Sequence, residues 1–372
     1  MKILMGLYGY IEHDGRVLRS IGSLTNDHDV SLFSHCKDEK FQISNARLLK
    51  RKNTYYAKNP YLEQILFFFA FLSKAIKLKP DIVYVHDYYL TFVGRIAKLV
   101  TGAKVVYDAH ELTIVEKEEK VDFRTKLFFF LERISIHSFD LIIAANDERA
   151  RMMKEYYGLE VQPEVVRNIP DVKISHDLFS KDQLEENFQV LKNSSSSIYI
   201  YQGVVTPIRR IDLLVGEIAK IENAIVLIVG GGSESYIQEL KNGFKEKGLE
   251  NVHFLGKVDL KTLYSLLNIS DFGLISYSDA NLNNKYCAPN KLYEYSQFQL
   301  PMITTGQEIF HTTFKNFKIG LVRKGSDSEF LQELNEISNN ENIKQEFEKF
   351  NKVYNQKEES LRLNQVISLL AK

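Results

Sequence analysis

The chain has 372 residues, a length typical of two domains. Its 48 lysines and arginines balance 48 aspartates and glutamates, which excludes a nucleic-acid binder that works mainly by neutralising phosphates. The longest apolar run, Ile65–Leu72, has 8 residues, whereas a membrane span needs ~20. The two cysteines, Cys36 and Cys287, exclude a disulfide framework, and no secretory signal follows Met1, so we expect a cytoplasmic protein.

Short apolar runs alternate with helix-length segments along the first half of the chain. The runs are continuous and do not alternate with polar residues, which predicts a parallel sheet covered on both faces, that is, βαβ architecture. The expected strands are Lys2–Leu7, Asp29–Ser34, Ile82–Val85, Lys104–Tyr107, Leu141–Ala144 and Glu164–Val166, and the expected helices are Arg16–Leu24, Tyr61–Lys77, Leu90–Val100, Asp122–Ser138 and Asp147–Tyr157.

Turn residues at Arg167–Asp171 and four serines within residues 192–197 predict a hinge near residues 170–195. Strand-like segments then resume at Ile198–Tyr201, Ala224–Val229, Val252–Leu255, Phe272–Ile275 and Met302–Thr304. The sequence thus predicts two α/β domains, residues 1–180 and 181–349, with a ligand in the cleft between them at the carboxyl ends of the strands.

Polar clusters follow two of the strands in the first domain. His86 and Asp87 end one strand, and Asp108–Glu111 end the next. Imidazole and carboxylate groups can hold a metal, and Asp87 or Asp108 can cap the following helix. We favour a third interpretation, contact with a polar substrate, because ligands bind at this edge of an α/β sheet.

The segment 288–295 predicts a helix N-terminus that meets the ligand. Asn290 is a good N-cap, so we expect a helix from Lys291, with Lys291 and Glu294 on one face. A cation, the helix N-terminus and a carboxylate suit the phosphates and the vicinal hydroxyls of a nucleotide diphosphate sugar. The alternative is an ordinary ion pair on a surface helix.

Two further loops could contact phosphates. Tyr201–Gly203 ends a strand and leads to Arg209 and Arg210 at a helix start, where cations oppose the helix dipole unless an anion lies between them. The alternative is a pair of solvated arginines. Gly230–Gly232 follows another strand and is read either as a tight turn or as a dinucleotide loop.

Basic residues are concentrated near the N-terminus. Residues 1–105 contain 16 lysines and arginines but 9 aspartates and glutamates. Four of them, Arg47, Lys50, Arg51 and Lys52, lie close to the aromatic segment Tyr61–Leu72. This pattern is typical either of a solvated face beside a buried helix or of a surface that binds anionic lipid head groups.

Taken together, these segments resemble the family 4 glycosyltransferases over nearly the whole chain. The resemblance rests on the order and spacing of 14–19 (DGRVLR), 80–87 (PDIVYVHD), 107–112 (YDAHEL), 167–170 (RNIP), 201–203 (YQG) with Arg209 and Arg210, 252–256 (VHFLG) and 289–295 (PNKLYEY). It implies the GT-B fold, an α/β fold of two Rossmann-like domains facing across a cleft, with a C-terminal helix, residues 350–372, packing back on the first domain.

The resemblance also implies the function, which is transfer of a sugar from a nucleotide-sugar donor to an acceptor hydroxyl, with retention and without a metal or other cofactor. The acceptor is expected to be a saccharide or a lipid-linked saccharide of bacterial surface polysaccharide or glycolipid assembly. The partners of the protein would include an anionic membrane surface, at the inner face of the membrane, but no nucleic acid.

The resemblance, together with the strand-end and helix-start positions described above, gives the expected site residues. Catalytic roles fall to His110, near the transferred sugar, and to Arg209 and Lys291 at the diphosphate. The expected donor-binding residues are Gly203, Arg210, Gly256, Lys257, Asn290 and Glu294, the last at the ribose. The expected acceptor or sugar contacts are Gly15, Arg16, His86, Asp87 and Glu111.

Three positions depart from the family pattern. Tyr286 stands where the family often has a second glutamate, Val204 replaces an upstream basic residue, and residues 296–301 lack the usual small residues. Two other functions stay open. One is a sugar-nucleotide epimerase of the same two-domain architecture, and the other, which Tyr286 makes conceivable, is a non-catalytic protein that binds sugar nucleotides.

Overall fold

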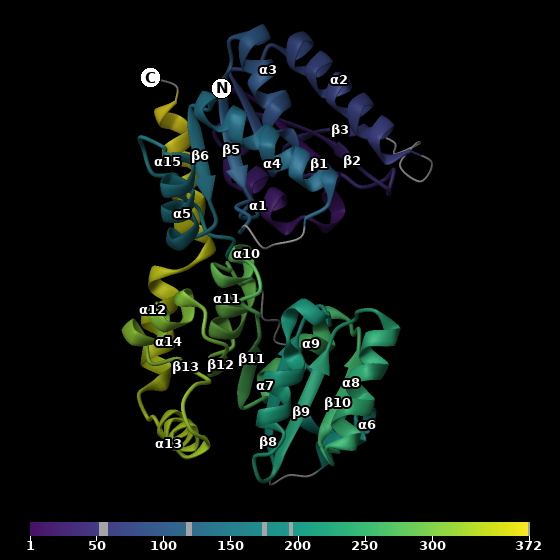
Figure 1. Ribbon diagram of the computed structural model, residues 1–372, viewed down its shortest axis with the longest axis vertical. Helices are drawn as coiled ribbons and strands as arrows, with labels where there is room; N and C mark the ends of the chain where they lie inside the picture. The colour runs from purple at the N-terminus through teal and green to yellow at the C-terminus, as the bar shows by residue number, and fades with distance from the viewer. Residues whose placement is uncertain (52–58, 117–120, 173–176, 193–195, 371–372) are drawn as a thin grey trace. The chain divides into compact units, whose positions relative to one another are not determined.

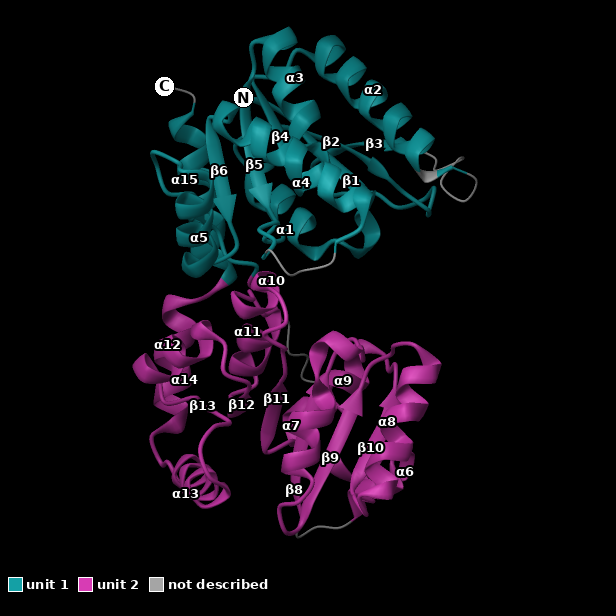
Figure 2. Ribbon diagram, in the orientation of Figure 1, with its two compact units in different colours: residues 1–168, 356–372 teal, residues 169–355 magenta. Residues whose placement is uncertain are grey.

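The computed structural model describes residues 1–51, 59–116, 121–172, 177–192 and 196–370. The chain forms two compact units, Met1–Asn168 with Gln356–Lys372, and Ile169–Asn355. Figure 1 labels their helices and strands, and Figure 2 colours unit 1 teal and unit 2 magenta.

Unit 1 is built on a seven-stranded sheet in the order β3-β2-β1-β4-β5-β6-β7. All neighbouring strands are parallel, as the continuous apolar runs predicted. The strands are β1 (Lys2–Tyr10), β2 (Asp29–His35), β3 (Arg47–Arg51), β4 (Ile82–His86), β5 (Lys104–Ala109), β6 (Leu141–Ala144) and β7 (Glu164–Val165).

Helices cover both faces of this sheet. Ile21 of α1 and Leu363 of α15 are buried in one core with Met5 of β1. On the other face, Phe71 of α2 packs against Phe33 of β2, and α3 contacts both α2 and α4. The helices are α1 (Gly15–Leu24), α2 (Pro60–Leu78), α3 (Thr91–Thr101), α4 (Phe123–Ser135), α5 (Asp147–Tyr157) and α15 (Gln356–Leu369), with 3₁₀ turns η1 (Ile11–His13), η2 (Tyr88–Leu90) and η3 (Ile136–Ser138).

Unit 2 has a six-stranded parallel sheet in the order β10-β9-β8-β11-β12-β13. Its strands are β8 (Ser197–Gln202), β9 (Ala224–Val229), β10 (Val252–Gly256), β11 (Phe272–Ile275), β12 (Met302–Thr304) and β13 (Gly320–Val322). Two buried clusters, one on each face, form its core. Its helices are α6 (Lys181–Asn187), α7 (Ile211–Ile218), α8 (Glu234–Glu246), α9 (Leu260–Ile269), α10 (Leu282–Lys285), α11 (Asn290–Gln297), α12 (Glu308–Asn316), α13 (Asp327–Ser338) and α14 (Ile343–Val353), with η4 (Gln189–Lys192) and η5 (Pro207–Arg209).

The units divide after Asn168, earlier in the chain than the boundary expected at residue 180. The physical reason is burial, because Ile169, Leu184 and Leu191 all pack into the core of unit 2. The expected hinge near 170–195 includes residues 173–176 and 193–195, which lie outside the described residues. At the other end, α14 belongs to unit 2, and only the segment from Gln356 packs on unit 1.

Two edge strands have no counterpart among the expected elements. β3 pairs with β2 although three of its five residues are basic, and β13 pairs with β12 over three residues. Each is short and lies at the edge of its sheet, where one neighbouring strand supplies the backbone hydrogen bonds and little apolar surface is needed.

The strand order reverses once in each sheet. In unit 1 the reversal lies between β1 and β4, and in unit 2 between β8 and β11. Connections leave in opposite directions from such a pair of strands, which opens a crevice at their carboxyl ends where ligands bind in α/β sheets. His86 and Asp87 lie at the end of β4 and Gly203 follows β8, while Asp108 and His110 lie at the end of β5, the strand next to β4.

Candidate functional site

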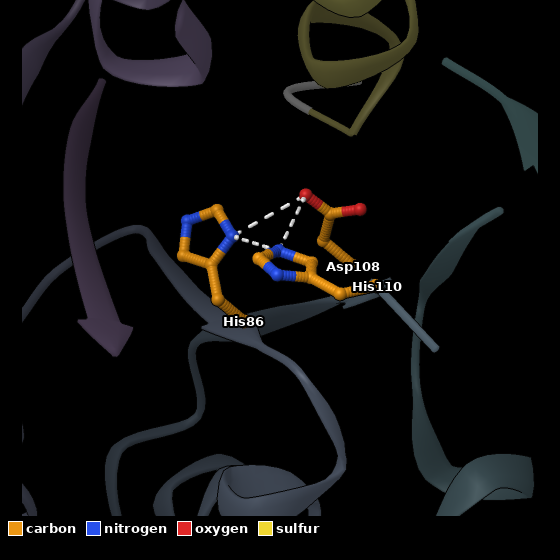
Figure 3. Close-up of side chains that lie close together, drawn as sticks. All are labelled: His86, Asp108 and His110. Carbon is orange, nitrogen blue, oxygen red and sulfur yellow. Dashed lines mark hydrogen bonds and ion pairs between the residues drawn. The ribbon is translucent and has the colours of Figure 1, made fainter. Parts of the chain in front are cut away.

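Three polar side chains meet at the carboxyl edge of the unit 1 sheet. His86 ends β4, Asp108 lies near the end of β5, and His110 follows that strand directly. Oδ2 of Asp108 lies 3.3 Å from Nδ1 of His86 and 3.6 Å from Nε2 of His110, and the two imidazole nitrogens are 3.3 Å apart (Figure 3). Neighbouring parallel strands therefore bring together groups that the sequence separates by more than 20 residues.

A buried ion pair anchors this cluster. Arg16, in the first turn of α1, places Nη2 2.5 Å from Oδ1 of Asp108, and its Nη1 donates to the carbonyl of Val166 at 3.1 Å. Burial acts to raise the pKa of Asp108, but the charge of Arg16 and hydrogen bonds from the two histidines hold that pKa well below its ordinary value. Asp108 is therefore an anion at neutral pH.

The two histidines differ in charge and in access. Burial lowers the pKa of His86, so this imidazole is neutral at pH 7. Burial acts in the same direction on His110, but the hydrogen bond and the charge of Asp108 raise the pKa of His110 above its ordinary value. His110 is also the member that a ligand can reach, since its side chain is 15% exposed while that of His86 is fully buried.

The same three side chains could hold a metal ion. Their donor atoms all lie within 4.8 Å of one another. Two imidazoles and one carboxylate form a common ligand set for divalent transition metals. However, Arg16 already neutralises the one carboxylate among them, so the geometry equally supports a cluster held by hydrogen bonds alone.

Three other expected contacts lie around this cluster. Asp87 has a left-handed backbone with φ 61°, and its side chain accepts from the N–H of Tyr88 at 2.9 Å, so it caps η2. Burial raises the pKa of Asp87 to about 6. Gly15 is the first residue of α1, and Glu111 is 53% exposed, 3.8 Å from Arg149.

In unit 2, glycines allow the loops after three strands to pack closely at the carboxyl edge. Gly203 follows β8 with φ 134°, and a Cβ there would lie 2.9 Å from Nζ of Lys291. A Cβ on Gly230 would lie 1.9 Å from the carbonyl oxygen of Gly203, and one on Gly231 2.6 Å from Cε of Lys257. Close backbone approach thus accounts for the glycine loop after β9 without a dinucleotide.

Two cations gather at this edge. The guanidinium of Arg209 lies 4.1 Å from the centroid of the Tyr277 ring, and its Nη1 is buried with no hydrogen-bond partner among the described residues. Burial and the nearby charge of Arg209 lower the pKa of Lys291 to about 8. A buried donor without a partner beside a second cation is the environment that an anion would stabilise.

Arg210 is separated from this pair by its backbone. It takes the left-handed conformation, with φ 47°, as the N-cap of α7. Its side chain is 49% exposed and lies 3.3 Å from Asp212, so a carboxylate on the surface already neutralises its charge. The structure therefore brings Arg209, but not Arg210, together with Lys291.

Glu294 lies on α11, one turn after Lys291. Its Oε2 accepts a hydrogen bond from Nε2 of Gln202, the last residue of β8, which fixes the carboxylate beside the same edge. The expected cap at Asn290 was wrong. Pro289 is the N-cap, and Asn290 is the first helical residue and makes no capping bond, because proline favours the start of a helix.

Three residues of these sites were not among the expected ones. Gln202 and Asp14 adjoin glycines of the quoted segments, and Asp14 lies 3.9 Å from Nδ1 of His110. The position of these residues next to Gly203 and Gly15 was a usable signal. No sequence signal pointed to Tyr277, since only the fold places its ring next to the guanidinium of Arg209.

Two family models match the chain. Residues 20–173 match "Glycosyltransferase Family 4", and residues 182–354 match "Glycosyl transferases group 1", so that together they account for most of the sequence. Together with the two Rossmann-like parallel-sheet units, these matches define a glycosyltransferase of the GT-B fold. The chain belongs to the family 4 glycosyltransferases.

Solved structures of the same fold cover the whole chain. The HepE protein of Anabaena, solved in complex with UDP, is 16% identical over 99% of this chain and 98% of its own, with a TM-score of 0.73. Sucrose-phosphate synthase from Thermosynechococcus elongatus is 14% identical over 100% and 99%, with a TM-score of 0.75. The lipopolysaccharide outer core galactosyltransferase WaaB is 16% identical over 99% of both chains, with a TM-score of 0.67.

No curated protein matches the sequence. Among the described residues, none of the helices combines the length and the apolar character that crossing a membrane requires.

Proposed function

We propose that this glycosyltransferase takes its sugar from a nucleotide-sugar donor and transfers it to an acceptor hydroxyl with retention at the anomeric carbon. The observation that carries the proposal is the pair of cations in unit 2. Arg209 has a buried, unpartnered Nη1 and lies close enough to Lys291 to lower its pKa. A diphosphate would satisfy both groups, because guanidinium and ammonium donors match phosphate oxygens.

The rest of the donor has a place on the same edge. Glu294, held by Gln202, can accept hydrogen bonds from the two vicinal hydroxyls of a ribose. The loop at Gly256 and Lys257 follows β10, beside the glycine loop after β9, and its backbone can meet the nucleobase. The related HepE structures contain UDP, UDP with glucose, or UDP-glucose, which supports a nucleotide sugar as the donor class.

The chemistry follows from the leaving group. A nucleoside diphosphate departs as an anion, so cations around it stabilise the charge that develops as the glycosidic bond breaks. The acceptor hydroxyl attacks from the same face and passes its proton to the departing phosphate, which accounts for retention without a covalent intermediate. In this proposal no metal takes part, and His110 contacts the transferred sugar.

We propose a saccharide or a lipid-linked saccharide of surface polysaccharide or glycolipid assembly as the acceptor, at the cytoplasmic face of the membrane. Two related proteins support this class of acceptor. WaaB is a galactosyltransferase of the lipopolysaccharide outer core, and WaaG, 13% identical over 98% of this chain, is a glycosyltransferase involved in lipopolysaccharide biosynthesis. Unit 1 would bind this acceptor, with Gly15, Arg16, His86, Asp87 and Glu111 at or behind the contact surface.

Thermal shift with a panel of nucleoside diphosphates identifies the base, since a ligand at ~100 times its Kd adds ~2.7 kcal/mol of stability. The matching labelled nucleotide sugar is then incubated with candidate acceptors, and the products are separated. A labelled glycoside with retained anomeric configuration supports the proposal. An isomerised sugar nucleotide would identify an epimerase, and unchanged nucleotide sugar in spite of tight binding would identify a non-catalytic protein.

A single substitution tests the donor site separately. Glu294→Gln removes the charge that accepts from the ribose and should weaken binding of the selected nucleoside diphosphate by roughly 1–3 kcal/mol. Glu239→Gln, an exposed glutamate on α8, is the matched control and should change nothing. Unchanged affinity of a folded Glu294→Gln protein, measured by calorimetry, would show that this carboxylate does not bind the ribose.

A further inference from the structure

One face of unit 1 exposes an unusual amount of apolar side chain. On α4, Phe123 is 81% and Phe130 57% exposed, and on α2, Phe69 is 69% exposed. These residues and their exposed apolar neighbours on the three helices are here called the α2–α4 face, which comprises Tyr61, Leu62, Ile65, Phe69, Ile76, Leu99, Val100, Phe123, Leu127, Phe130 and Ile134. Exposed apolar patches of this extent mark binding surfaces.

The three helices form one layer, so the α2–α4 face is continuous. α3 contacts α2 on one side and α4 on the other. At the N-terminal ends, Arg124 of α4 joins the outer helices directly, since its Nη2 donates to Oε1 of Gln64 on α2 at 2.9 Å and its guanidinium lies 5.6 Å from the ring of Tyr61. On α4 the exposed residues Phe123, Leu127, Phe130 and Ile134 recur at the helical period and form one stripe.

The charged side chains exposed on the three helices themselves are basic. Within the described residues of α2, α3 and α4, the carboxylates are Glu63 and Glu132, and both are fully buried. The exposed Asp122 precedes α4 and is held as its N-cap by the N–H and the hydroxyl of Thr125. Glu63 accepts from Arg51 at 2.8 Å, and Glu132 accepts from the hydroxyl of Tyr107 at 2.6 Å. Lys126 and Arg133, by contrast, are exposed among the apolar residues of α4.

We propose that the α2–α4 face docks on an anionic lipid bilayer, with its aromatic and aliphatic side chains at the level of the head groups. Apolar residues interleaved with lysines and arginines, with no exposed carboxylate inside the described part of the three helices, are the chemistry that binds such an interface. An apolar protein partner would give no reason for exposed acidic residues to be missing from these helices.

The α2–α4 face begins at the same edge of the sheet as the cluster of His86, Asp108 and His110. Crossover helices of a parallel sheet begin at the carboxyl edge of the strands, so Tyr61 and Phe123 lie at the edge that carries His86 and Asp108. Aromatic contacts connect the two regions, because the ring of Tyr88, next to Asp87, lies 5.3 Å from that of Phe129 on α4. A bilayer on this face would present a lipid-linked acceptor beside the cluster; this last step rests on the proposed function.

The proposed membrane surface differs from the cluster of basic residues that the sequence singled out. Arg51 is engaged with buried Glu63, and Nζ of Lys50 donates to backbone carbonyls of Asp38 and Glu39. Lys52 lies outside the described residues. Arg47–Arg51 thus form an edge strand in which two of the three cations bind to the protein itself.

Co-sedimentation with vesicles of phosphatidylcholine, with and without about 30 mol% phosphatidylglycerol, tests the proposal. The full chain should bind the anionic vesicles at low salt and lose binding as salt rises. The double variant Phe123→Ser/Phe130→Ser should bind at least about tenfold more weakly, since it removes two exposed apolar anchors. Val161→Ser, 77% exposed but in the loop after α5, is the matched control and should bind as the parent does.

Absence of binding to anionic vesicles at low salt would overturn the proposal, as would a double variant that binds like the parent. A change from dimer to monomer in the double variant, seen by gel filtration with light scattering, would assign the face to a second copy and overturn it too. An unchanged circular dichroism spectrum and an unchanged urea unfolding curve show that unit 1 of the variants is folded. Transfer to a soluble acceptor tests the proposed function separately from membrane binding.

Discussion

Arg16 and Asp108, 92 residues apart in the chain, form an ion pair of 2.5 Å in which both side chains are buried. A buried pair costs desolvation energy that its attraction must offset, so removal of one partner leaves an uncompensated charge. Asp108→Asn should therefore destabilise the protein by about 3–5 kcal/mol in urea unfolding followed by circular dichroism. The exposed pair Arg210–Asp212 gives the control, because Asp212→Asn should cost no more than ~1 kcal/mol. Equal effects of the two substitutions would show that the buried pair has no special role.

Arg209 and Arg210 are adjacent in sequence but differ in what they contact, which allows a matched comparison. Arg209→Ala should reduce the affinity for UDP roughly tenfold or more, since charged hydrogen bonds are worth about 1.5–3 kcal/mol. Arg210→Ala should have a small effect, because Asp212 neutralises that side chain at the surface. Uridine, which lacks phosphate, should bind both variants alike in calorimetry. A similar loss of uridine binding in Arg209→Ala would make Arg209 structural.

Lys291 makes donor binding depend on pH. Burial and Arg209 lower its pKa to about 8 in the ligand-free protein, and a bound diphosphate would raise it. Affinity for UDP should therefore be full below pH 8 and fall by up to about tenfold per pH unit above it. Lys291→Arg retains the charge and should flatten this profile between pH 7 and pH 9.5. A profile that stays unchanged in Lys291→Arg would assign the titration to another group.

Glu132 predicts a second pH dependence, that of stability. Burial raises its pKa from 4.5 to about 7, while hydrogen bonds from Thr113, Tyr107 and Tyr157 act in the opposite direction. The folded state then binds more protons than the unfolded state between these values, so the contribution of Glu132 to the free energy of unfolding should fall by roughly 3 kcal/mol as pH rises from 4.5 to 7. Glu132→Gln should make the pH profile of stability shallower by that amount in urea titrations, while the contribution of Asp87, whose pKa is raised to about 6, remains. Parallel stability profiles for the parent and Glu132→Gln would contradict the assignment.

Chelation distinguishes the two chemical interpretations of His86, Asp108 and His110. Because the proposed transfer uses Arg209 and Lys291 to stabilise the leaving group, activity should persist after dialysis against EDTA. His110→Gln should still lower the rate, since it removes the one imidazole of the cluster that a ligand can reach. Loss of activity in EDTA, with recovery on addition of a single divalent ion, would instead assign the cluster to a metal.

Much of the fold was readable from the sequence because burial of parallel strands leaves a local signal. Runs such as Ile82–Val85 and Ala224–Val229 are apolar on both faces, and the structure has β4 and β9 at these places. The short strands β3 and β13 left no such signal, because an edge position demands little apolar surface. The sequence also contained no local signal for the domain boundary after Asn168, since that boundary depends on which core buries Ile169 and Leu184.

The sequence by itself determined the two α/β units, the family, and the residues that adjoin strand ends and glycines, such as His110, Glu294 and Gly203. Only the tertiary structure decided which of these meet. It pairs Arg16 with Asp108 and directs Arg209 toward Lys291 and Arg210 toward Asp212. It also buries Glu63 and Glu132, so that the charged side chains exposed within the described residues of α2, α3 and α4 are basic. The physical reason is that strand patterning and turn chemistry act between neighbours in the chain, whereas ion pairing, desolvation and exposure depend on what the fold places within a few ångströms.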